Sequence, residues 1–86
     1  MQPTPPFWFV LRQGKAEPAG ENVLRLKAPN LPEWHIAIKK GENGLWAGAV
    51  RKQADGPDVD ATDPKYDDPN DAWNAAFELY REKVVV

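Results

Sequence analysis

The sequence contains no cysteine and no serine, and its only histidine is His35. Without these side chains the chain cannot form a disulfide, a thiolate metal site, or a Ser/His/Asp or Cys/His catalytic arrangement. The glycines around residues 41–44 do not form a phosphate-binding loop, because the required lysine and following helix are missing. We therefore expect a protein that is not an enzyme and that uses no cofactor, with His35 in a structural role or on the surface.

Long apolar runs are also missing, and none approaches the length that a bilayer requires, so we expect no contact with membranes. Residues 1–6 hold three prolines and lack the basic start and apolar stretch of a secretory signal. A chain of 86 residues without disulfides fits a reducing compartment, which favours a cytoplasmic location. The prolines predict an extended arm over residues 1–6, followed by one domain over residues 7–86.

The charges are unevenly distributed along the chain. Residues 1–54 carry eight bases and four acids, whereas residues 55–71 carry seven aspartates and one lysine, a net charge of −6. The aspartates fall in and just after a predicted loop over residues 53–68, which is longer than the loops of most compact domains. The net charge of −2 therefore combines a basic body with an acidic segment.

Apolar periodicity predicts an α+β fold, in which a small antiparallel sheet of about four strands carries one C-terminal amphipathic helix on a face. The predicted strands are 7–12, 23–27, 34–40 and 45–52, and the predicted helix is 69–83. The first of these strands is apolar on both faces, which favours a central or covered position. Residues 13–22 are rich in turn formers and are predicted to be a loop.

The last two predicted strands form a hairpin with a specific register. A three-residue loop, residues 42–44, places the apolar faces of both strands on one side, because side chains alternate with a period of two. Ile36 then faces Val50, and Gly44 takes the left-handed position in the turn. We expect the helix to dock on the opposite face, which is lined by small side chains: Ala37, Ala47 and Ala49.

The start of the helix is predicted by a local pattern. Asp68 can cap the helix, and Pro69 suits the first helical position, where its missing amide costs nothing. Apolar residues then recur at helical spacing, including Trp73, Phe77 and Tyr80.

The leading functional hypothesis is a small protein-interaction module that binds a second copy of the chain or an unidentified protein partner. It rests on the lack of catalytic side chains, on an apolar C-terminal tail and on a strand with two apolar faces. The candidate contact residues are Val84, Val85, Val86 and Trp8.

A nucleic-acid-binding domain with a basic sheet surface is the alternative hypothesis. Its phosphate contacts would be Arg25, Lys27, Lys39, Lys40, Arg51 and Lys52. This hypothesis ranks second, because the acidic segment would repel phosphate.

A divalent-cation site in the acidic loop is the weakest hypothesis. Residues 58–63 place oxygen ligands at alternating positions, as the start of a calcium loop does, and the candidate ligands are Asp58, Asp60 and Asp63. The pattern then departs from that loop, since Asp63 occupies the place of its glycine and Pro69 the place of its glutamate.

Overall fold

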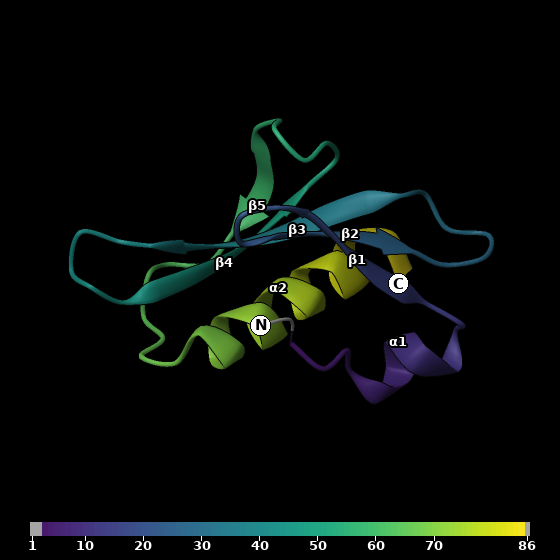
Figure 1. Cartoon of the computed structure of the whole chain (residues 1–86), viewed down its shortest axis with the longest axis horizontal. Helices are drawn as coiled ribbons and strands as arrows, with labels where there is room; N and C mark the ends of the chain where they lie inside the picture. Colours follow the sequence, from purple (N-terminus) through teal and green to yellow (C-terminus); the bar gives the residue numbers. More distant parts are fainter. Residues whose placement is uncertain (1–2, 86) are drawn as a thin grey trace.

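An antiparallel sheet with a helix across one face forms the framework of the protein (Figure 1). The structure is a computed structural model that describes residues 3–85. The α+β class is confirmed, with five strands rather than about four. The five strands lie in chain order across the sheet: β1 (Lys15–Gly20), β2 (Val23–Lys27), β3 (Trp34–Lys40), β4 (Trp46–Arg51) and β5 (Asp58–Ala61). None of the helices in this described range has the length and apolarity to cross a bilayer.

The first element is the short helix α1 (Phe7–Leu11), so the predicted strand over 7–12 is wrong. The helix ends in a Schellman motif, in which the amides of Gln13 and Gly14 donate to the carbonyls of Val10 and Phe9, both at 2.9 Å. Phe9 is the fully buried residue of this helix, whereas the predicted strand would have buried apolar side chains on both of its faces. Insertion of Phe9 into the core thus outweighs the strand propensity of these aromatic and branched residues.

Strands β1 and β5 lie in the two stretches predicted to be loops, 13–22 and 53–68. Strand β1 is an edge strand, where Pro18 is tolerated because its missing amide leaves no bond unmade within the sheet. Beyond β5 the chain still follows β4, since the amide of Thr62 donates to the Gly48 carbonyl at 2.8 Å. Long-range pairing with β4 therefore orders the acidic segment, for which turn-forming residues had predicted a loop.

The hairpin of β3 and β4 has the predicted register, with Ile36 opposite Val50. The Gly41 amide donates to the Leu45 carbonyl at 2.7 Å, which closes a three-residue loop. Gly44 in that loop has a φ of 82°, the left-handed conformation expected of it.

The C-terminal helix α2 (Pro69–Tyr80) begins as predicted, with the Asp68 carboxylate accepting a hydrogen bond from the Asn70 amide at 2.9 Å. It continues as a single π-helical turn, η1 (Arg81–Val85), rather than ending at residue 83.

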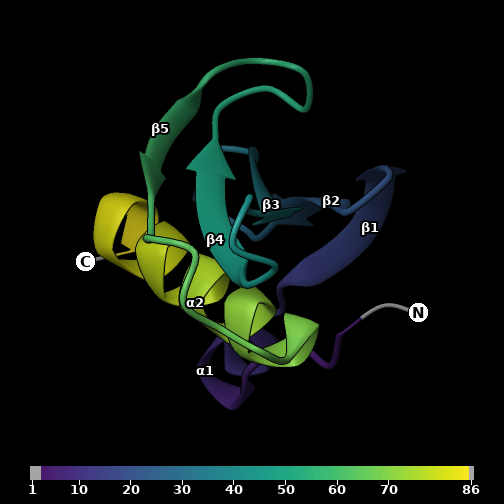
Figure 2. The ribbon, with the colours of Figure 1, turned by 90° about the vertical axis from the view of Figure 1, so that its left-hand side faces the viewer.

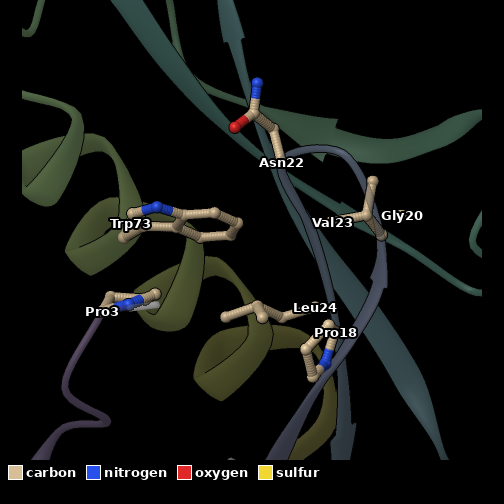
Figure 3. Close-up of a pocket in the computed structure, with 7 residues that line it drawn as sticks. All are labelled: Pro3, Pro18, Gly20, Asn22, Val23, Leu24 and Trp73. Atoms are coloured by element: carbon tan, nitrogen blue, oxygen red, sulfur yellow. The ribbon is translucent and has the colours of Figure 1, made fainter. Parts of the chain in front are cut away.

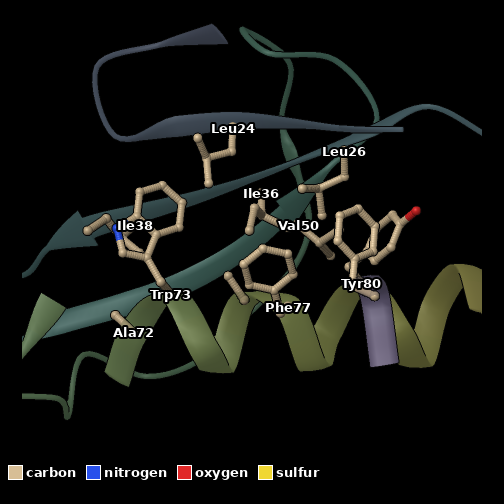
Figure 4. Packing of buried hydrophobic residues seen from close by; sticks show 11 residues of the cluster. Leu24, Leu26, Ile36, Ile38, Val50, Ala72, Trp73, Phe77 and Tyr80 are labelled. Carbon is tan, nitrogen blue, oxygen red and sulfur yellow. The ribbon is translucent and has the colours of Figure 1, made fainter. Parts of the chain in front are cut away.

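Helix α2 packs on the isoleucine face of the hairpin, so the prediction of docking on the alanine face is wrong. The close approach is made at Gly48, where a β-carbon would lie 2.5 Å from the Ala72 carbonyl oxygen. The glycine thus lets the helix backbone approach this face of the sheet. Ile36, Ile38 and Val50 lie between the sheet and α2 (Figure 4). The resulting core consists of Phe9, Leu24, Leu26, Ile36, Ile38, Val50, Ala72, Trp73, Ala76, Phe77 and Tyr80.

Candidate interaction surface

Helix α1 has an apolar outer face. The exposed fractions of Phe7, Val10 and Leu11 are 76, 53 and 67%. These residues follow the spacing i, i+3, i+4, which places them together on one face of a helix. We call them the α1 outer face. A helix that is apolar on every side is normally buried. The outer face of α1 is instead exposed to solvent.

The inner side of α1 packs against aromatic residues of α2. The Phe9 ring lies 5.6 Å from the Phe77 ring and 5.8 Å from the Tyr80 ring, measured between centroids. Trp8 stacks on Tyr80 at 6.4 Å and has the Arg81 guanidinium 5.9 Å from its ring centroid. These contacts hold α1 on the same side of the sheet as α2, which two views agree on (Figures 1 and 2).

The predicted contact residues are less exposed than a contact surface requires. Trp8 is half-buried against the body, and Val84 and Val85 pack against the core rather than projecting from it. Val86 lies outside the described residues. The residues that sequence reasoning missed are Phe7, Val10 and Leu11, although their helical spacing could have identified them.

Side-chain packing holds the N-terminal segment (residues 3–11) and the hinge that follows it (residues 12–14) against the rest of the protein. Within residues 3–85, the hydrogen bonds of this stretch remain inside it, and no ion pair joins it to the rest of the chain. The hydroxyl of Tyr80, buried where α1 docks, also has no hydrogen-bond partner among these residues. Burial raises the pKa of Tyr80, and the positive charge of Arg12 partly offsets the rise.

The other end of the N-terminal segment reaches a cavity of about 160 Å³. Pro3 lines it from the arm, Trp73 from α2, and Pro18, Asn22 and Val23 from the β1–β2 hairpin (Figure 3). The segment therefore lies near α2 at both of its ends, with Pro3 and Trp73 lining one cavity and the Phe9 ring packed on the Tyr80 ring.

Most of the candidate phosphate-binding residues are engaged with carboxylates. Lys40 is exposed, and the Lys52 Nζ lies 5.8 Å from the Trp34 ring centroid. The other four bases are paired with three carboxylates, because Asp58 serves both Lys39 and Arg51, and this pairing removes much of the positive field that a nucleic-acid site needs. The four pairs are Arg25 Nε with Glu33 Oε1 (3.2 Å), Lys27 Nζ with Glu17 Oε1 (3.1 Å), Arg51 Nε with Asp58 Oδ1 (2.7 Å), and Lys39 with Asp58.

Asp58 joins β5 to the face of the sheet that lies away from α2. It contacts Lys39 and Arg51, which share that face with the buried Ala37 and Ala49. Burial works against ionisation of Asp58, but hydrogen bonds from the two bases and their charges outweigh it. The pKa of the Asp58 carboxyl is therefore held below its ordinary value.

The three aspartates of the candidate cation site do not converge. Asp58 faces two bases, Asp60 Oδ2 lies 3.5 Å from Lys83 Nζ, and Asp63 is exposed. Within residues 3–85 no group of three potential ligands is placed to hold a metal ion. The geometry gives the cation hypothesis no support.

His35 lies on the face of the sheet away from α2 and is only 7% exposed. Its Nδ1 lies 3.3 Å from the Lys52 carbonyl oxygen, which can only accept, so Nδ1 carries the proton in this contact.

In comparisons with known proteins, the chain matches no protein-family model, no curated protein and no solved structure. The α+β fold and the α1 outer face are accordingly the basis for a functional proposal.

Proposed function

We propose that this protein is a non-catalytic, cytoplasmic interaction module that associates with a second copy of itself through the α1 outer face. The supporting observation is the exposure of Phe7, Val10 and Leu11 on one side of a five-residue helix. An uncharged apolar face is complementary to itself. A two-fold axis would set Phe7 of one copy against Leu11 of the other.

The size of this face sets the expected strength of association. Burying the exposed parts of three large apolar side chains on each of the two copies contributes roughly 6–12 kcal/mol. The loss of rotational and translational freedom offsets much of that gain. Contact through the α1 outer face alone therefore predicts weak association, with a dissociation constant on the order of 1 mM.

Sedimentation equilibrium over a range of concentrations tests the proposal. We expect the apparent mass of the wild-type protein to rise with concentration and that of Leu11→Glu to stay at the monomer value. Val59→Glu is the matched control, because Val59 is an exposed apolar residue on β5, with 42% of its surface accessible. A wild-type protein that stays monomeric into the millimolar range would show the proposed function to be wrong.

A further inference from the structure

The manner in which the N-terminal segment is attached points to a specific form of self-association, which rests on the proposed function. We propose that two copies exchange their N-terminal segments, so that residues 3–11 of each copy pack against α2 of the other. The partner is thus a second copy of this chain, and the contacts made are those seen within one copy.

The segment is suited to exchange because it carries its own hydrogen bonds. The backbone bonds of α1 and of its Schellman end are closed within residues 6–14. Moving the segment from one copy to another therefore breaks and remakes its side-chain packing, with Phe9 as the deepest anchor, and gives up only the two Schellman hydrogen bonds at the hinge. In domain exchange these contacts are identical in the open and closed forms, so the hinge decides between them.

The closed form of the hinge contains a strained residue. Gln13 has a φ of 60°, in the left-handed region that costs a residue with a side chain roughly 1–2 kcal/mol relative to glycine. Helices usually place glycine at this position of a Schellman motif. When the hinge opens, Gln13 returns to an ordinary conformation, and the strain of the short reversal is released.

Exchange would also enlarge the interface beyond the α1 outer face. The anchors at Phe9 and Trp8, together with the arm beside Trp73, would all become contacts between copies. Two such segments are buried in each dimer, which adds the most deeply packed apolar residues of the segment to the contact area. Each closed monomer makes the same contacts, so they leave the association constant to the hinge, but they slow the dissociation of an exchanged dimer once it has formed.

Two substitutions at one residue shift the balance in opposite directions. Proline at position 13 has its φ fixed near −65° and has no amide to donate to Val10, so Gln13→Pro disfavours the closed hinge. Each dimer opens two hinges, so the effect enters twice, and we expect the dimer association constant to rise by on the order of ten-thousandfold. Gln13→Gly removes the left-handed strain from both closed forms and should lower that constant by about a hundredfold. Each constant is measured by sedimentation equilibrium.

Cross-linking shows which copy each segment occupies. The chain has no cysteine of its own, so Pro3→Cys combined with Val23→Cys introduces one pair of thiols, at two residues on either side of the same cavity, which a flexible bis-maleimide can bridge. After cross-linking at high concentration, exchange predicts a covalent dimer on a denaturing gel. Cross-linking of the same variant at low concentration, where the closed monomer prevails, should give an intrachain link and a monomer band.

The outcomes separate the two proposals. Concentration-dependent association accompanied by a monomer band at every concentration would overturn the exchange and leave the proposed function standing. Association constants unchanged between Gln13→Pro and Gln13→Gly would also overturn the exchange. Monomers at all concentrations, in both the wild type and Gln13→Pro, would overturn both proposals.

Discussion

Gly14 lies directly against the ring of Phe9, so that a β-carbon at position 14 would come within 2.5 Å of two ring carbons. Gly14, which closes the Schellman motif after α1, is thus packed on Phe9, which anchors α1 in the core. This contact makes the docking of α1 sensitive to a single methyl group.

Gly14→Ala should therefore loosen α1 from the body. Overpacking of this kind costs about 1–3 kcal/mol in unfolding free energy, measured by urea denaturation. The matched control is Gly56→Ala in the β4–β5 loop, where the nearest atom to a β-carbon is the Gln53 Cβ at 3.3 Å. Equal stability of the two variants would contradict the contact.

Gly48→Ala should be the more damaging glycine substitution. Its β-carbon would lie 2.5 Å from the Ala72 carbonyl oxygen and 2.8 Å from the Ala76 amide nitrogen, both in the α2 backbone. A helix backbone cannot move aside as a ring can, so we expect a loss of about 3 kcal/mol, at the upper end for overpacking. Urea denaturation alongside Gly56→Ala measures it. A loss no larger than that of Gly14→Ala would argue against this packing.

Tyr80→Phe should stabilise the protein. The substitution removes a buried hydroxyl that has no partner within residues 3–85 and keeps the ring that packs on Phe9. The expected gain is about 1–2 kcal/mol in unfolding free energy at neutral pH.

The raised pKa of Tyr80 adds an alkaline test of the same substitution. Stability due to the neutral phenol is complete below the ordinary value of 10.0 and is lost as the pH rises through the raised pKa. Thermal melts above pH 10 should thus fall less steeply for Tyr80→Phe than for the wild type. Tyr66→Phe is the control, and an equal change in both variants would refute the assignment to Tyr80.

Asp58→Asn should destabilise the sheet in a pH-dependent way. Asp58 is 22% exposed, and it compensates Arg51, which is 16% exposed, so we expect a cost of about 1–2 kcal/mol at pH 7. Since the pKa of Asp58 is lowered, this contribution is present above the ordinary value of 3.8 and disappears as the pH falls through the lowered value.

Asp63→Asn serves as the control for that experiment, because Asp63 is an exposed acid in the same segment. Melts recorded from pH 7 to pH 2 should show the Asp58→Asn curve converging on the wild-type curve at the acid end. A gap that persists at pH 2 would mean that the loss has another cause than the charge.

The elements that sequence reasoning predicted correctly are those specified by neighbouring residues. Alternation of side chains fixed the register of Ile36 and Val50, and Asp68 with Pro69 marked the start of α2. Both depend on interactions within about twenty residues, so no knowledge of the rest of the fold was required.

The first helix was missed because it depends on distant residues. Phe7–Leu11 has the composition of a strand and becomes a helix because Phe9 inserts beside Phe77 and Tyr80, some seventy residues away. The candidate interaction surface was missed for the same reason. A segment predicted to be a strand suggested Trp8 as a contact residue, but it gave no reason to expect Phe7, Val10 and Leu11 to share one exposed face. Strand β5 was missed for a different reason, because it pairs with β4 only 7 to 12 residues away but its aspartates and the turn formers around it favoured a loop.

Edge strand β1 places Pro18 in its middle, with Lys15 and Glu17 beside it, and the opposite edge carries Asp58 and Asp60. Neither edge offers the uninterrupted, uncharged row of backbone groups on which another chain could build a fibril. Under the proposed two-fold contact through α1, association would end at a pair, and we expect concentrated solutions of the protein to stay clear rather than gel.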